Sequence, residues 1–280
     1  MGQYAFPALH GLLIWWFSTG LILFLDGLPR RTFRWSMAGA TTLLLAALYE
    51  LAISASDTSV SGAYTAFTCG VLIWGWLEIS FYMGYVTGPR THRCENGCGG
   101  WRHFGHAIQA CLYHELAVLL LAAAVIGLTW GRANQFGAWT FIVLWWMHLS
   151  ARLNVFLGVA NLNAEFLPDH LDHIKSFLTH KPMNLLFPFS VTASTICAVM
   201  LSQRAAGFGA DTFGTAGYTL LATMMVLAIL EHWFLVMPLP ALNLWNRLWH
   251  WSLGSRVRRA IPQQPAKATL PGQATIGGCS

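Results

Sequence analysis

Seven long apolar runs constrain the fold of this chain more than any other feature of its sequence. Each run has about 20 residues or more, enough for a helix to cross the hydrocarbon core of a bilayer. Only 10% of the 280 residues are Asp, Glu, Lys or Arg, whereas a soluble globular domain carries about 25%. The sequence therefore predicts an all-α, polytopic membrane helical bundle and excludes an ordinary soluble enzyme. The predicted spans are residues 7–27, 35–55, 62–86, 105–130, 136–160, 184–203 and 214–237.

Basic residues gather on one side of these spans. Fourteen Lys and Arg fall on that side, against Arg132 and Arg204 on the other. Because cytoplasmic loops are enriched in Lys and Arg, we expect the N-terminus outside and the C-terminus in the cytoplasm. The net charge of +5 is then explained by topology and contact with anionic lipid, and no nucleic-acid partner is expected.

The chain is expected to have three parts. Residues 1–240 form the seven-helix transmembrane domain. Residues 241–260 mix Trp with Arg and read as a basic interfacial segment. Residues 261–280 are rich in Pro, Gln and Gly, which predicts a disordered cytoplasmic tail. The first apolar run has no Lys or Arg before it, so we expect a retained helix and not a signal peptide.

Ionisable residues inside the predicted spans are the first functional candidates. Each costs about 2.5–3.5 kcal/mol on insertion scales, so it suggests a function by default. At 1.5 Å per residue they fall in one layer, roughly 8 to 18 Å below the cytoplasmic boundary. The small residues flanking His114 at helical spacing predict that it faces the bundle. The layer comprises Glu78, His114, Glu115, His148, Arg152, Glu231 and His232.

A bound cation would balance the charges of this layer. Three glutamates accompany one arginine, which leaves two negative charges unless glutamates are protonated, histidines are charged or a cation binds. The pairs His114–Glu115 and Glu231–His232, with Glu78, offer ligands suited to iron, manganese or zinc. The Glu-x-x-His spacing of di-iron bundles is absent. The alternatives are a self-neutralising polar core and a pocket for a tetrapyrrole, such as bacteriochlorophyll or a precursor, or for a quinone.

The fifth span carries a stripe of small and polar residues, so we expect it to be central in the bundle. It also supplies the candidate cofactor-binding residues His148, Arg152 and Asn154.

Two inner loops carry further candidates. The first has a Cys-x3-Cys followed by His-x2-His, a set that suits tetrahedral zinc, although a plain loop with reduced cysteines is the competing interpretation. The second contains Glu165 and His170, candidate metal ligands on a segment that could cover the polar layer. Its acids also suit a solvated helix cap, and its histidines are similar to fragments of the histidine boxes of membrane desaturases. The first loop's residues are Cys94, Cys98, His103 and His106.

Five strings resemble the PuhE family of photosynthetic complex assembly proteins from purple and related phototrophic bacteria. The resemblance runs from about Gly11 to Pro240. It is carried by LPRRTFRWSMAGAT at 28–41, YHEL at 113–116, LNVFLGVANLNAEFLPDH at 153–170, PMNLLFPFSVTAST at 182–195 and EHWFLVMPLP at 231–240.

This resemblance implies a multi-pass protein of the bacterial inner, intracytoplasmic photosynthetic membrane. It implies a role in assembling reaction-centre and light-harvesting complexes and in the bacteriochlorophyll supply that feeds them. Partners would be subunits of those complexes or enzymes of the bacteriochlorophyll pathway. The family motifs include His114, Glu115, Glu165, His170, Glu231 and His232.

Three hypotheses for function follow. The first is a non-enzymatic assembly factor. The second is a membrane metalloenzyme, such as a di-metal oxidoreductase, acting on a lipophilic tetrapyrrole, carotenoid or quinone through the buried His/Glu cluster. The third is a transporter, which no inverted repeat in the sequence supports.

Overall fold

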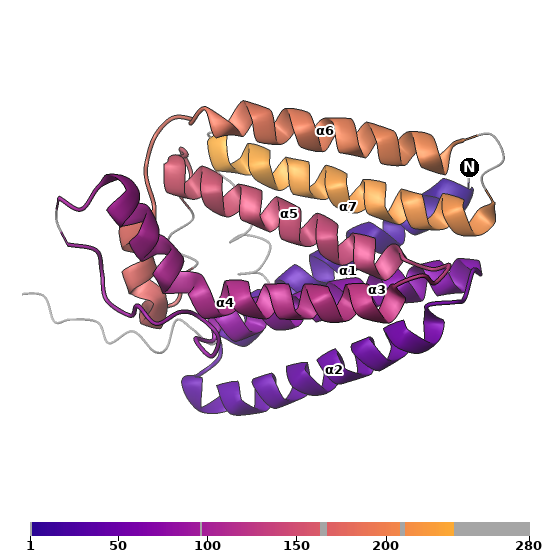
Figure 1. The fold of residues 1–280 in the computed structure, drawn as a ribbon, viewed down its shortest axis with the longest axis horizontal. Coiled ribbons are helices and arrows are strands. Elements are labelled where there is room, and N and C mark those ends of the chain that lie inside the picture. Colours follow the sequence, from indigo (N-terminus) through magenta and orange to yellow (C-terminus); the bar gives the residue numbers. More distant parts are fainter. Residues whose placement is uncertain (1, 96, 163–166, 208–210, 238–280) are drawn as a thin grey trace, which may run out of the picture. The chain divides into compact units, whose positions relative to one another are not determined.

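Seven long helices make up the computed structural model, which describes residues 2–95, 97–162, 167–207 and 211–237 (Figure 1). All seven predicted spans are confirmed as helices long and apolar enough to cross a membrane. The described residues contain no β-strand, only an isolated bridge between Val159 and His180. The predicted segments 241–260 and 261–280, and Glu165, lie outside the described residues. The elements are α1 (Gly2–Asp26), η1 (Arg30–Thr32), α2 (Phe33–Ser54), α3 (Val60–Tyr82), α4 (Gly100–Thr129), α5 (Phe136–Leu157), η3 (Asp169–Phe177), α6 (Leu186–Ala205) and α7 (Thr212–Val236).

Large apolar side chains remain exposed along the outer helices. Phe17 on α1, Leu45 on α2, Leu120 on α4 and Phe189 on α6 each leave more than 60% of their surface uncovered. An apolar surface that extends over several helices is unfavourable in water but favourable in contact with lipid. The described part of the chain therefore has the surface of a multi-pass membrane protein.

Helices α3 and α7 are the most deeply buried. Half or more of the most apolar stretch of each is buried, 56% for α3 and 50% for α7, compared with 28% for α5. Helix α3 packs against α1, α2, α4, α5 and α7. The fifth span, expected to be central, contacts α3, α4, α6 and α7 but is less buried than α3 or α7.

Glycines let α3 and α5 approach closely. A Cβ added to Gly70 on α3 would lie 2.7 Å from the carbonyl oxygen of Gly137 on α5, and one added to Gly137 would lie 2.8 Å from the carbonyl oxygen of Ala66. Small residues at such contacts are typical of helices that associate in membranes. This close packing places the later turns of both helices side by side.

One end of the bundle carries the long connections. Helix α3 ends at Tyr82 and α5 at Leu157, a few residues before their predicted ends, because Gly84 and Gly158 take the positive φ angles of +80° and +123° that favour glycine. The described residues that follow, 83–95, 97–99, 158–162 and 167–185, share this end with η1 and the start of α2 (Figure 1). We call it the loop-rich end. Its described basic residues are Arg30, Arg31, Arg34, Arg90, Arg93, Arg102, Lys175 and Lys181.

Candidate metal centre

Three helices bring Glu78, His114 and His148 together inside the bundle. They come from α3, α4 and α5, and each offers one ligand atom, all within 4.8 Å of one another. Glu78 Oε1 lies 3.3 Å from His148 Nδ1. As predicted, His114 faces the bundle, with no exposed surface. We call these three residues the intramembrane cluster.

Most ligand atoms of the intramembrane cluster lack a hydrogen bond. Both ring nitrogens of His114, Nε2 of His148 and Oε1 of Glu78 are buried without a hydrogen-bond partner among the described residues. Buried polar atoms in proteins are nearly always paired, and an unpaired one costs about 1–3 kcal/mol. One ligand atom from each of the three side chains lies within 4.8 Å of the other two, and a metal ion bound among them would give unpaired atoms a partner.

Aromatic rings hold the two imidazoles in place. Phe81 packs edge-on against His114, with ring centroids 4.9 Å apart, and Trp74 packs edge-on against His148 at 5.2 Å. The two histidine rings are 5.8 Å apart. Donors this close together suit a single ion and leave no space between them for a tetrapyrrole macrocycle.

Glu115 and Arg152 form a separate ion pair. Arg152 Nη1 donates to Glu115 Oε1 at 2.5 Å, and its guanidinium carbon lies 4.7 Å from the centre of the Phe81 ring. The pair neutralises the one arginine of the predicted layer. Glu78 is therefore left without an arginine as its ion-pair partner.

The second predicted His/Glu pair has other partners. Glu231 accepts a hydrogen bond from Trp15 Nε1 at 3.0 Å. His232 is 2.9 Å from the Ala228 carbonyl through Nδ1, and 2.9 Å from Ser150 Oγ through Nε2. With both ring nitrogens engaged, His232 links α7 to α5 and offers no free ligand atom.

Asn154 and His170 also lie in other contacts. Asn154 Nδ2 donates to the Ser150 carbonyl and to Ser190 Oγ, at 2.9 and 3.1 Å, which joins α5 to α6. His170 on η3 donates through Nε2 to the Tyr82 carbonyl at 2.7 Å, so it caps the end of α3. Burial lowers the pKa of His170.

His170 also lines a cavity of about 400 Å³ at the loop-rich end. Arg30, Phe33 and His173 share its wall.

Sequence comparison covers nearly the whole chain. The family model described as "Protein of unknown function (DUF3623)" matches residues 1–260. The chain belongs to this family. A relative from Rhodobacter capsulatus, named "Uncharacterized 30.4 kDa protein in puhA 5'region", is 38% identical over 275 residues, which cover 96% of this chain and 97% of the relative. No solved structure matches the chain.

The DUF3623 match includes all seven helices and the whole intramembrane cluster. Of the three cluster residues, sequence reasoning assigned Glu78 and His114 to a metal and His148 to a cofactor pocket. The sequence feature that the three residues share is their depth, because all three occupy the same layer of the bundle. Depth alone does not give the rotation of each helix, and the contacts of α3 with α4 and α5 supply it.

Proposed function

We propose that this DUF3623 chain is an assembly factor for photosynthetic complexes in the inner membrane of a phototrophic bacterium. It would serve reaction-centre and light-harvesting assembly and the bacteriochlorophyll supply that feeds it. Two findings support the proposal. The Rhodobacter capsulatus relative is named for the puhA 5' region and matches over almost the full length of both chains. Five strings of the sequence resemble the PuhE family, which shares the puh designation.

The intramembrane cluster carries the mechanistic part of this proposal. We infer that it binds one divalent metal ion, because its buried ligand atoms have no other described partner. Two neutral imidazoles and a carboxylate form a ligand set that zinc, iron and manganese all accept. An ion held by α3, α4 and α5 would make the positions of these helices, and the lateral surface they present to partner subunits, depend on metal.

A second candidate function is a membrane metalloenzyme. The specific observation in its favour is that the described residues supply the intramembrane cluster with three protein ligands. Two histidines and one carboxylate with open positions are typical of catalytic zinc sites and of non-haem iron oxygenases. A lipophilic tetrapyrrole, carotenoid or quinone could then reach the ion from the bilayer.

Metal analysis of the purified protein tests the site. The chain is extracted in mild detergent, and its metal and pigment contents are measured for the wild type, Glu78→Gln and His114→Ala. Glu50→Gln serves as the matched control, because Glu50 is an exposed glutamate on α2. We expect the wild type and the control each to hold about one metal ion per chain more than either cluster variant. Equal metal in all four proteins would overturn the site.

A deletion strain tests the function and separates the two candidates. For an assembly factor, we expect fewer assembled reaction-centre and light-harvesting complexes, and capture of their subunits or of pigment-pathway enzymes by the tagged chain. For a metalloenzyme, we expect one lipophilic precursor to accumulate, with accumulation also seen for Glu78→Gln. Unchanged complexes and unchanged pigment in the deletion strain would contradict both.

A further inference from the structure

Four Cys and His side chains, of types that bind metals, lie near the point where the loop between α3 and α4 enters α4. His106 Nδ1 lies 3.3 Å from Cys94 Sγ and 3.4 Å from Cys98 Sγ. His103 Nδ1 lies 3.3 Å from Cys94 Sγ. The ligand atoms of Cys94, Cys98 and His106 are all within 4.8 Å of one another. None of these residues belongs to the intramembrane cluster.

The spacing of these atoms matches a tetrahedral zinc site. With Zn–S bonds of about 2.3 Å and Zn–N bonds of about 2.0–2.1 Å, sulfur and nitrogen ligands at the tetrahedral angle lie about 3.6 Å apart. The three observed S···N distances are 3.3–3.4 Å. These three pairs are therefore already separated by nearly one edge of such a tetrahedron, and His103 would have to move closer to the group formed by Cys94, Cys98 and His106.

The local backbone explains why the ligands converge. Gly97 and Gly100 take positive φ angles of +85° and +61°, so the chain turns sharply between Cys98 and the helix as well as between the two cysteines. His103 and His106 are one helical turn apart on α4 and project from the same side. The loop thus presents two thiols to two imidazoles.

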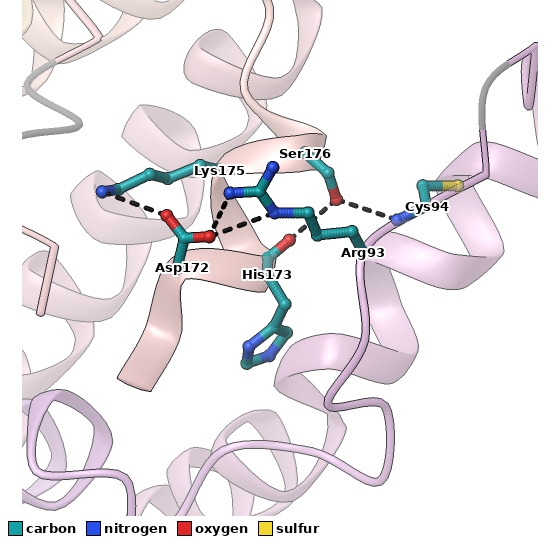
Figure 2. A network of polar contacts seen from close by, with 6 residues as sticks. All are labelled: Arg93, Cys94, Asp172, His173, Lys175 and Ser176. Carbon is teal, nitrogen blue, oxygen red and sulfur yellow. Dashed lines mark hydrogen bonds and ion pairs between the residues drawn. The ribbon is translucent and has the colours of Figure 1, made fainter. Parts of the chain in front are cut away.

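The loop is also held against η3 (Figure 2). The backbone N–H of Cys94 donates to Ser176 Oγ at 3.1 Å, and the Ser176 hydroxyl donates to the His173 carbonyl at 2.7 Å. Next to it, Arg93 forms an ion pair with Asp172. These contacts position Cys94 without using its thiol, which stays available for a metal.

We propose that Cys94, Cys98, His103 and His106 bind one structural Zn²⁺ ion at the loop-rich end. Four protein ligands fill the coordination shell, as in closed structural sites, so the ion would have no open position for catalysis. Its effect would be to anchor the loop, and with it η3, to the start of α4. This site does not depend on the proposed function or on the intramembrane cluster.

The ring of His103 explains how the anchor would reach η3. It stacks on Phe156 at the end of α5, with centroids 5.5 Å apart, and packs against Phe177 of η3 at 5.3 Å. A zinc ion that fixes this imidazole would therefore fix the contact between α4, α5 and η3.

The experiment measures zinc per chain in the purified full-length protein. All variants carry Glu78→Gln, so that the intramembrane cluster contributes no metal. We expect one zinc per chain in this background, near zero in Cys94→Ser/Cys98→Ser, and one zinc in Cys111→Ser, which removes a thiol of α4 outside the proposed site. Cys98→His replaces one ligand type by another and should retain zinc. Retention there shows that loss in the serine variant reflects lost ligands and not lost folding.

Two further measurements complete the test. Cobalt substituted for zinc should give the visible d–d and thiolate charge-transfer bands of a tetrahedral site, and these should be absent from Cys94→Ser/Cys98→Ser. Proteolysis within residues 167–180 should be faster in that variant than in Cys111→Ser. Equal zinc in Cys94→Ser/Cys98→Ser and in Cys111→Ser, or a Cys94–Cys98 disulfide in a metal-free wild type, would overturn the proposal.

Discussion

At the scale of single residues, the intramembrane cluster is defined by what its atoms do not contact. His114 is fully buried, yet neither of its ring nitrogens has a hydrogen-bond partner in the described chain. A polar core that only fixed helix register would satisfy these atoms, as the contacts of His232 do. The two histidines therefore differ in their contacts, although both were predicted as metal ligands.

Replacing His114 by leucine distinguishes a metal ligand from an unpaired polar side chain. An unpaired buried imidazole replaced by an apolar group should leave stability unchanged or raised. A ligand that is lost should remove the stabilisation by bound metal, about 2.7 kcal/mol at a metal concentration 100 times the Kd. We expect His114→Leu to lower the thermal midpoint in detergent. A chelator should abolish the difference from wild type, whereas a variant at least as stable without chelator would contradict the site.

The Arg152–Glu115 pair gives a second prediction at this scale. Arg152→Met leaves Glu115 partly buried without its partner, so it should lower the free energy of unfolding by as much as about 3 kcal/mol. Adding Glu115→Gln removes the uncompensated charge and should recover part of the loss. A double variant less stable than Arg152→Met alone would show that the two side chains do not form the pair.

The residues of the polar layer could be predicted from the sequence, but their pairing could not. Charged side chains inside apolar spans stand out, and counting along each helix gave their common depth. Three glutamates at one depth could each pair with Arg152, and only the rotation and approach of the helices select Glu115. Trp15 on α1 donates the hydrogen bond to Glu231. Because Trp15 is uncharged, the charge pattern of the sequence does not predict it as a partner.

At the scale of elements, the close approach of α3 and α5 supports the intramembrane cluster. Gly70 and Gly137 allow their backbones to meet, two turns or more from Glu78 and His148. The apolar runs predicted these helices to within a few residues. They did not predict the ends at Tyr82 and Leu157, because the positive φ angles of Gly84 and Gly158 depend on what packs against them.

Widening this helix contact should disturb the cluster without touching its ligands. A Cβ at Gly70 would clash with the carbonyl of Gly137 and with Thr140. We expect Gly70→Ala to cost about 1–3 kcal/mol of stability and to lower bound metal. Gly75→Ala is the control on the same helix, because its Cβ meets nothing within 4 Å. Equal metal and stability in the two variants would mean that this contact does not position the cluster.

The docking of η3 should depend on pH. Burial lowers the pKa of both His170 and His173 from the usual value of 6.5. The released segment therefore binds protons more readily than the docked one, so docking is at full strength above about pH 6.5 and weakens as the pH falls below it. The pKa of Asp172 is lowered by Arg93, so this carboxylate stays charged throughout that range.

Hydrogen exchange of residues 167–180 measures this docking. We expect exchange, corrected for its intrinsic pH dependence, to be faster at pH 5.5 than at pH 7.5. The neighbouring groups that act on the two histidines are Arg30, Asp169, Asp172 and His92. His170→Gln/His173→Gln should remove the difference between the two pH values. A difference of the same size in the double variant would assign it to one of the neighbouring groups.

At the scale of the whole molecule, the seven spans and the basic residues support one orientation. Eight described Lys and Arg lie at the loop-rich end, against Arg132 and Arg204 at the other end. The positive-inside rule then predicts that the loop-rich end, with its proposed zinc site, faces the cytoplasm. The count could be made from the sequence because it needs only the order of the spans.

Cysteine labelling tests this orientation. Arg204→Cys, introduced in a chain whose own cysteines are replaced, should react with a membrane-impermeant maleimide added to intact spheroplasts. Lys181→Cys, at the loop-rich end, should react only after the membrane is opened. The opposite pattern would reverse the topology and place the proposed zinc site outside.

X-ray absorption at the metal edge tests the intramembrane cluster most directly. The purified protein carries Cys94→Ser and Cys98→Ser, so that no thiolate site contributes. We predict one bound metal with nitrogen and oxygen ligands, including the outer-shell scattering of two imidazoles, and its loss when Glu78→Gln is added. A protein that binds no metal, or one whose ligands are unchanged by Glu78→Gln, would contradict the metal centre on which the proposed mechanism rests.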